Sequence, residues 1–350
     1  MPGPMIGEAG WQLQLGDYIT ALSVSPDGEL LAAGSLAGDA ILVAADGSLV
    51  SKLTEHSMGV LCGAWAPDGN RLAIGGQDGL VRVYDRSGDE LGVLAGTGWI
   101  AQVAWSPDDS LLAVTDGRQL ALCDSEAQLV HRFPAVSSTI TAISWATNGR
   151  RVGITSYGGI TWYDPDHLPR EAPSRTHVFK GSPLALVLAP NGKWACAGFQ
   201  DSSIHLWRLW SGDDLSMSGY PAKIEHLAFR DDSHWMASAC LDELTVWDFS
   251  GKGPKGSRPA TGTAHQRHIS CLEWEPAGTR LLSGGADGRL VLWPSPRSVN
   301  RPLEPDFVHE GEVAVAAVAW HPAGESILVG RADGTVEQRP VAAAPTTTRR

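Results

Sequence analysis

Two histidine–aspartate pairs are the first candidates for chemistry in this sequence. His56 is followed by Asp78, and His265 by Asp287, in equivalent places of a repeated unit. An imidazole beside a carboxylate can serve as a general base, but it needs a nucleophile to activate, and neither pair has one near it in the sequence. A buried imidazole and carboxylate can also satisfy each other's hydrogen bonds. Because both pairs recur with the repeat, we predict that they brace the structure and are not catalytic.

A second set of residues could hold a metal ion or a small ligand: His226, Glu225, Cys271 and His268. No Cys-x-x-Cys or His-x-His spacing accompanies them, and the sequence contains no Gly-x-Ser-x-Gly, His-Glu-x-x-His or P-loop motif. We therefore predict a protein without enzymatic activity, cofactor or metal. The alternative function is metal or small-ligand binding, or an activity, that uses His226, His268 and Cys271.

The elements that must position these residues are short strands joined by tight turns. Residues 60–65, 72–75 and 81–84 are apolar or alternating runs, each too short for a helix. Between them lie Ala66-Pro67-Asp68-Gly69 and Gln77-Asp78-Gly79, whose residue types favour turns. The unit is predicted to be strand, turn, strand, turn, strand.

Eight copies of the first turn recur along the chain. Their second residues are Pro26, Pro67, Pro107, Thr147, Pro190, Asp231, Pro276 and Pro322, which lie 40 to 46 residues apart. This interval suits one four-stranded blade of a β-propeller, which takes roughly 40–45 residues. The eight turns predict eight blades, with seven as the alternative if one copy is a loop.

The copies resemble the WD-repeat family, in which a Gly-His pair precedes the inner strand, an Asp lies in the second turn and a Trp-Asp pair ends the third strand. The match varies between copies, and the one literal Trp-Asp pair is Trp247-Asp248. The resemblance implies an all-β fold, a single closed propeller, with hydrogen bonds among these positions bracing each blade. The bracing positions are occupied by His56, Asp78, Tyr84, Asp201, Trp207, Trp247, His265, Asp287 and Trp293. Copies one, three, four and eight lack the set, so apolar packing is expected to hold them.

The two ends of the chain are predicted to close the ring together. Residues 11–15 alternate between apolar and polar before the first inner strand, whereas the eighth copy ends after its third strand. An N-terminal strand that completes the last blade would remove an exposed sheet edge. The propeller then spans residues 11–341, and residues 1–10 and 342–350 are expected to be disordered.

Composition narrows the class of partner and the cellular setting. The formal net charge is −12 and no apolar run approaches 18 residues, so we expect neither nucleic-acid nor membrane binding. Five cysteines without paired spacing, and an N-terminus without a signal peptide, predict a cytoplasmic protein. Few lysines and arginines and many alanines and glycines suggest a bacterial source. Two basic insertions, residues 250–259 and 294–302, are either solvated loops or a site for an acidic partner.

The resemblance directs recognition to the face of the ring where the loops before the inner strands and the second turns surround a channel. The residues predicted to bind a partner there are Tyr18, Gln77, Trp99, Tyr157, Gln200, Lys223 and His268. Aromatic side chains among polar groups are typical of interaction hot spots. A second group of tryptophans shares one inner-strand register and is assigned to the core: Trp65, Trp105, Trp145, Trp274 and Trp320. We predict a non-catalytic platform that binds protein or peptide partners on this face.

Overall fold

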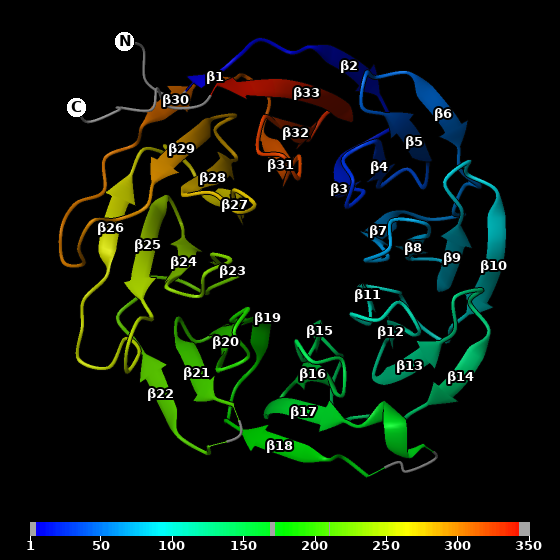
Figure 1. Cartoon of the computed structure of the whole chain (residues 1–350), viewed down its shortest axis with the longest axis horizontal. Helices are drawn as coiled ribbons and strands as arrows, with labels where there is room; N and C mark the ends of the chain where they lie inside the picture. The colour runs from blue at the N-terminus through cyan, green and yellow to red at the C-terminus, as the bar shows by residue number, and fades with distance from the viewer. Residues whose placement is uncertain (1–4, 169–171, 210, 343–350) are drawn as a thin grey trace, which may run out of the picture.

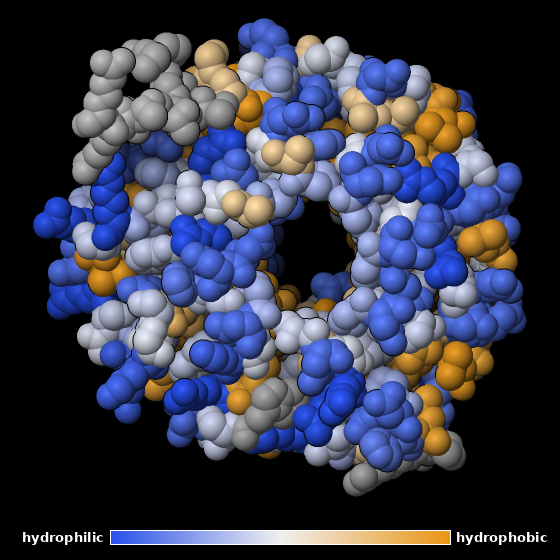
Figure 2. Space-filling model, viewed as in Figure 1, coloured by the Kyte–Doolittle hydropathy of each residue, from blue (hydrophilic) through white to orange (hydrophobic). Residues whose placement is uncertain are grey.

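Eight antiparallel sheets follow one another around a central channel in the computed structural model, which describes residues 5–168, 172–209 and 211–342 (Figure 1). Each sheet is a blade whose first strand lines the channel and whose last strand lies at the perimeter. The predicted all-β, eight-bladed propeller is confirmed. The space-filling view shows that the channel remains open through the ring (Figure 2).

The strands of successive blades are equivalent in position. The inner strands are β3 (Ile19–Val24), β7 (Val60–Trp65), β11 (Val103–Trp105), β15 (Ala142–Trp145), β19 (Pro183–Leu188), β23 (His226–Phe229), β27 (Ile269–Trp274) and β31 (Val315–Trp320). The second strands are β4 (Leu30–Ser35), β8 (Leu72–Gly76), β12 (Leu112–Asp116), β16 (Val152–Ser156), β20 (Trp194–Phe199), β24 (Trp235–Cys240), β28 (Arg280–Gly285) and β32 (Ser326–Arg331).

The two peripheral strands complete each blade. The third strands are β5 (Ala40–Ala44), β9 (Leu80–Tyr84), β13 (Gln119–Cys123), β17 (Gly159–Tyr163), β21 (Ile204–Arg208), β25 (Glu243–Asp248), β29 (Leu290–Pro294) and β33 (Thr335–Ala342). The outer strands are β6 (Leu49–Lys52), β10 (Glu90–Ala95), β14 (Leu129–Arg132), β18 (Arg175–Val178), β22 (Asp214–Met217), β26 (Ala260–Thr263), β30 (Phe307–His309) and, for the eighth blade, β2 (Trp11–Gln14) with β1 (Met5–Ile6). A single 3-10 turn, η1 (Pro165–His167), follows β17, and no helix in the described residues is long and apolar enough to cross a membrane.

The first turn of each blade closes in the same way, whether or not it carries glycine. Gly69 adopts a φ of +71° and donates its backbone N–H to Ala66 O at 2.8 Å. Ser233 occupies the equivalent place in the sixth blade with a φ of +62° and donates to Arg230 O at 2.8 Å. The hydrogen-bonded turn therefore persists even where a non-glycine residue must take the left-handed conformation that glycine adopts without strain.

Adjacent blades are joined by the inner-strand tryptophans, which are buried as predicted. The indole N–H of Trp105 donates to Ala64 O at 3.1 Å, and that of Trp145 donates to Ala104 O at 2.9 Å. Trp274 and Trp320 repeat the contact with the sixth and seventh blades at 3.1 and 3.2 Å. Each of these tryptophans fills the space between two sheets and satisfies a carbonyl oxygen of the preceding blade, so one residue provides both packing and orientation.

The ends of the chain meet in the eighth blade, where β2 and β1 both pair with β33 (Figure 1). The prediction that residues 11–15 close the ring is confirmed. The prediction that residues 1–10 are disordered is wrong for residues 5–10, because β33 is long enough to pair with two N-terminal segments. Ile6 is buried against the core, and Gly7 and Gly10 donate to Pro340 O and Gln338 O. The predicted tail starts one residue too early, since Ala342 pairs with Met5, and residues 343–350 lie outside the described part.

Ion pairs, and not apolar packing alone, brace two of the blades that lack the family's histidine. In the eighth blade the carboxylate of Glu337 accepts from Arg331 at 2.6 Å and from Arg339 at 3.1 Å, and all three side chains are buried. In the third blade the buried carboxylate of Asp116 pairs with Arg132. The expectation of apolar packing is therefore corrected for these two blades, because guanidinium groups supply the donors that histidine supplies elsewhere.

Candidate functional site at the channel mouth

One backbone hydrogen bond recurs at the same end of the blades and positions the candidate site. The residue after the second strand donates its N–H to the carbonyl of the residue before the inner strand. The recorded cases include Leu36 to Tyr18 at 2.9 Å, Gln77 to Gly59 at 2.8 Å, Gln200 to Ser182 at 3.0 Å and Ala286 to His268 at 2.9 Å. In these blades, the loop before the inner strand therefore contacts the turn after the second strand at the same point. We call the surface that these loops and turns form around the channel the mouth face.

The side chains at these points differ in how much surface they offer. Trp99 is 57% exposed and Tyr157 is 50% exposed, while Gln200, Lys223 and His268 are also exposed. Tyr18 and Gln77 are only half-buried and contribute less area. The mouth face thus presents two large aromatic rings with polar neighbours.

Three exposed apolar side chains belong to the same face and were not among the predicted site residues. Leu241 is 50% exposed in the turn between β24 and β25, Leu36 is exposed in the corresponding turn of the first blade, and Met58 is exposed in the loop before β7. The sequence places Leu36 and Leu241 on this face, because they precede the same turn position as Gln77 and Gln200, but the predicted site did not include them.

A second set of exposed apolar side chains lies on the outer strands of blades one to four, away from the mouth. Its members are Leu49, Val50, Leu91, Val93, Leu129, Val130 and Val178. Figure 2 shows apolar surface at the perimeter beside β6, β10 and β14. These residues are spread along four separate outer strands and do not converge on one opening. They therefore provide control positions for substitutions at the mouth face.

The mouth face is hollowed between the sixth and seventh blades. A cavity of about 320 Å³ is lined by Lys223, Glu225, His226, Leu241 and His268, among others. The Lys223 ammonium lies 2.8 Å from the Glu225 carboxylate, and burial lowers the pKa of His226 from its ordinary value of 6.5. The cavity joins an apolar wall to a cation and two imidazoles, which suits a side chain with both apolar and polar atoms.

The geometry does not support the alternative metal set of His226, His268 and Cys271. Within the described residues, no group of three or more His, Cys, Asp or Glu side chains is arranged to hold a metal ion. Burial raises the pKa of the Cys271 thiol to about 12, which is typical of a thiol packed against a hydrophobic core. His226 and His268 line the mouth cavity, whereas Cys271 does not.

The two histidine–aspartate pairs lie inside blades. His56 Nδ1 is 2.9 Å from the carboxylate of Asp78, and His265 Nδ1 is 3.1 Å from that of Asp287. The second pair continues through Ser283, whose hydroxyl lies 2.8 Å from His265 Nε2 and accepts from the indole of Trp293 at 2.8 Å.

This Ser–His–Asp arrangement is closed to substrates because Ser283 and the His265 side chain are 0% exposed. The hydroxyl is also engaged by both neighbours, so it braces the blade as the sequence implied. In the second blade Ile74 takes the place of Ser283, and His56 Nε2 has no partner in the described residues. Tyr84 instead donates its hydroxyl to Thr54 O at 3.4 Å.

Three other bracing residues have different partners from those expected. Asp201 accepts from the Ser203 hydroxyl at 2.6 Å and, within the described residues, from no histidine, and Trp207 packs against the rings of His205 and His177. Trp247 donates to the hydroxyl of Tyr220 at 2.9 Å. Tyr220 was missed, although it lies four residues before the buried Ile224, as His265 lies four residues before Ile269.

Comparison with known proteins agrees with this architecture. A family model described as "WD domain, G-beta repeat" matches residues 13–42, 47–85, 173–208, 256–294 and 305–337, together about half of the chain. Each matched segment joins the outer strand of one blade to the next three strands, and the first segment starts in β2, the outer strand of the eighth blade. Much of the third, fourth and sixth blades is unmatched, and these blades carry Gly96, Val136 and Tyr220 where the family has histidine.

Curated relatives match over parts of their own length. Mouse telomerase protein component 1 is 22% identical over 264 residues, which is 71% of this chain and 10% of that protein. Chicken serine-threonine kinase receptor-associated protein is 26% identical over 51% of this chain and 52% of its own, and the small ribosomal subunit protein RACK1 of Schizosaccharomyces pombe is 29% identical over 31% and 36%. The chain therefore spans between a tenth and about half of these relatives.

Among solved structures, the C-terminal WD40 domain of Sif2 superposes with a TM-score of 0.80 at 18% identity, covering 97% of this chain and 99% of that one. At this level of identity the likeness concerns the fold alone.

Proposed function

The chain belongs to the WD40-repeat family, and from that premise we propose that it is a non-catalytic platform that binds a protein or peptide partner with the mouth face. The observation that carries the proposal is the convergence of Trp99, Tyr157 and Leu241, each at least half exposed, around one channel opening. Burying such side chains is favourable, and aromatic residues dominate the energetics of many interfaces.

The relatives support a role in assembly. Their printed names describe a telomerase component, a small ribosomal subunit protein and a receptor-associated protein. Each name describes a protein that is part of a larger assembly or is associated with another protein. We propose that the present chain likewise acts by holding a partner.

The charge of the chain favours a protein partner over a nucleic acid. A formal net charge of −12 opposes the approach of phosphate backbones, and the mouth face offers aromatic and aliphatic surface with few cations. Its five free cysteines, two of which are half-buried and three buried, suit a reducing compartment, so we propose a cytoplasmic protein. The few lysines and arginines and the many alanines and glycines favour a bacterial source.

The test uses tagged protein in three forms: the natural sequence, Trp99→Ala with Tyr157→Ala, and Leu91→Ala with Leu129→Ala. The last pair removes exposed apolar side chains from outer strands and is a matched control. Proteins captured from a lysate of the source organism are quantified by mass spectrometry. We expect a partner that the natural and control forms retain and that the mouth variant loses at least tenfold; equal capture by all three forms would refute the mouth face as the binding surface.

A further inference from the structure

The two basic insertions come together at the perimeter between the fifth, sixth and seventh blades. The first links β25 to β26 and carries Lys252, Lys255 and Arg258, and the second follows β29 and carries Arg297 and Arg301. Asn300 donates its backbone N–H to Pro259 O at 3.2 Å, and Thr261 donates to Arg301 O at 3.3 Å. The second insertion therefore lies directly against the end of the first. We call these five cations the basic rim patch.

The patch carries positive charge that the protein itself does not neutralise. Neither insertion, residues 249–259 or 294–303, contains an aspartate or a glutamate. Throughout the described ranges, no carboxylate forms an ion pair with any of the five cations, although many arginines elsewhere are paired. Five unpaired cations stand out on a chain with a formal net charge of −12. Such a patch attracts an acidic ligand.

The first insertion is held in place and does not merely extend into solvent. Pro254 is buried, and Ser257 donates both its hydroxyl and its backbone N–H to Pro254 O at 2.8 and 3.0 Å. Gly253 packs so closely on Trp194 of the fifth blade that an added Cβ would lie 2.6 Å from the indole. Its φ of +86° also favours glycine. The loop is thus fixed across the boundary between two blades.

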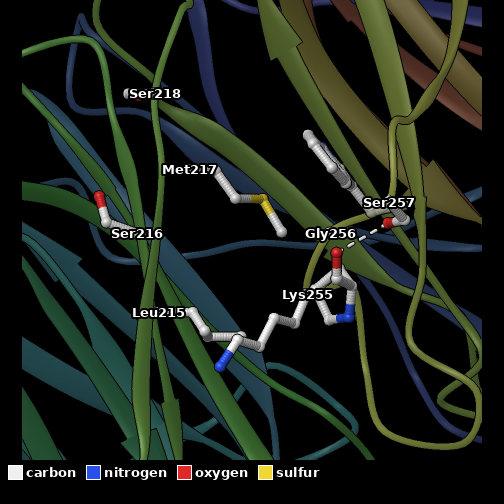
Figure 3. A pocket seen from close by; sticks show the side chains of 9 residues that line it. Leu215, Ser216, Met217, Ser218, Lys255, Gly256 and Ser257 are labelled. Atoms are coloured by element: carbon white, nitrogen blue, oxygen red, sulfur yellow. Dashed lines mark hydrogen bonds between the residues drawn. The ribbon is translucent and has the colours of Figure 1, made fainter.

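A groove runs beside this loop. One hollow of about 290 Å³ lies between β22 and the loop and is lined by Leu215, Met217, Trp247 and Lys255. Figure 3 shows the side chain of Lys255 extending from the loop towards the strand that carries Leu215, Ser216 and Met217. A second hollow of about 280 Å³ shares Trp247 and Ser218 with the first and reaches Arg258, with Glu243 also on its wall.

The groove also offers main-chain hydrogen bonds. β22 is the last strand of its sheet and, among the described strands, pairs with β21 alone, so its other edge can pair with an added strand. An extended peptide can add to such an edge while its side chains occupy pockets on alternate sides. The apolar wall of Leu215, Met217 and Trp247 suits one aliphatic side chain, and Lys255 and Arg258 lie where neighbouring carboxylates would be held.

We infer that this groove is a second binding site, which takes an extended acidic peptide of a protein partner along β22. Aspartate or glutamate side chains pair with Lys255 and Arg258, and one aliphatic side chain rests against Trp247. An extended peptide is favoured over RNA or an anionic membrane because the groove combines an apolar wall with a strand edge that can pair with a main chain. This site is separate from the mouth face.

The test pans a phage-displayed random nonapeptide library on protein carrying Trp99→Ala and Tyr157→Ala, which removes the two exposed aromatic side chains of the mouth face. The comparison forms add either Lys255→Glu with Arg258→Glu, or the control pair Arg150→Glu with Lys193→Glu, which changes exposed cations elsewhere. We expect the first and control forms to enrich acidic peptides with an aliphatic residue, and the Lys255 and Arg258 form not to enrich them.

Affinity is then measured by fluorescence anisotropy with a labelled peptide from the enriched pool. The Lys255 and Arg258 form should bind at least tenfold more weakly, and replacing the peptide carboxylates by amides should have a similar effect. Enrichment of neutral peptides, or equal binding by all forms, would overturn the inference. So would binding of poly(U) RNA or of phosphatidylserine vesicles that depends on Lys255 and Arg258 while no acidic peptide binds.

Discussion

The indole N–H of Trp247 donates a 2.9 Å hydrogen bond to the hydroxyl of Tyr220, which stands where the seventh blade has His265. The same hydroxyl lies 3.3 Å from both Ser238 and Thr245, so four polar groups meet inside the sixth blade. Burial raises the pKa of Tyr220, which keeps its hydroxyl protonated and able to donate as well as accept. A tyrosine thus provides the bracing that histidine and aspartate provide in two other blades.

The first prediction concerns this hydroxyl. Tyr220→Phe should lower the free energy of unfolding by about 1–3 kcal/mol, because it leaves the Trp247 indole without its acceptor inside the blade. Urea unfolding followed by tryptophan fluorescence measures the change. Tyr157→Phe is the control, since Tyr157 is half exposed and should change stability little. Equal effects of the two substitutions would show that the network does not brace the blade.

A second prediction follows from the buried His177. Burial, with a smaller contribution from the nearby Arg175, lowers the pKa of His177 from 6.5 to about 4. The unfolded chain therefore binds a proton at a pH where the folded protein does not, and the free energy of unfolding falls as the pH drops from 6.5 towards 4. The loss is up to about 1.4 kcal/mol for each pH unit within that window.

His177→Gln should flatten this part of the stability profile because glutamine does not titrate. Chemical unfolding at pH 7.5, 6.0 and 5.0 measures it, with His268→Gln as the control at an exposed histidine. A profile as steep in His177→Gln as in the natural protein would assign the acid sensitivity to other groups.

The third prediction tests the ion pairs that brace the closing blade. Burial alone would raise the pKa of Glu337, but the guanidinium groups of Arg339 and Arg331 outweigh it and hold the pKa below its ordinary value. Glu337→Ala leaves two buried guanidinium groups without their partner, which should cost about 3–5 kcal/mol of stability. Glu310→Ala removes an exposed partner of Arg289 and should cost at most about 1 kcal/mol. Similar losses in thermal or urea unfolding would mean that the Glu337 pairs contribute no more than a surface pair.

The fold was predictable because its signals repeat. Eight turns such as Ala66-Pro67-Asp68-Gly69 recur at intervals of similar length. The repeat period is therefore evident even where one copy matches the family pattern poorly. Tyr220 and Arg331 were not predictable in the same way. Tyr220 replaces the expected histidine with a residue of different shape, and Arg331 lies at the end of β32, away from the histidine position of its blade. Their role depends on partners from other strands, Trp247 and Glu337, which the sequence does not show to be neighbours.

Of the two candidate sites, the sequence predicted one and only the structure revealed the other. Trp99 and Tyr157 were identified because the repeat register places them in the mouth loops. The groove beside Trp247 required the structure, since β22 and the loop of Lys255 belong to different blades. Their sequences carry no periodic signal that links one to the other.

The last prediction is that substitution of Leu241 stabilises the fold and weakens binding of the partner. This leucine adopts a φ of +54° in the mouth turn, a left-handed conformation that costs a leucine about 1–2 kcal/mol, and half of its surface is exposed. Neither feature favours leucine for folding, and under the proposed function the side chain contacts the partner at the mouth. Leu241→Asn should raise the free energy of unfolding by about 0.5–1 kcal/mol, because asparagine tolerates this conformation. The backbone carbonyl of residue 241 still accepts from Ile269 N.

The same Leu241→Asn variant should bind the mouth-face partner at least tenfold more weakly, as measured by calorimetry, with Leu129→Asn as the control on an outer strand. A less stable Leu241→Asn protein that binds its partner with unchanged affinity would show that the leucine serves the fold and not the mouth face.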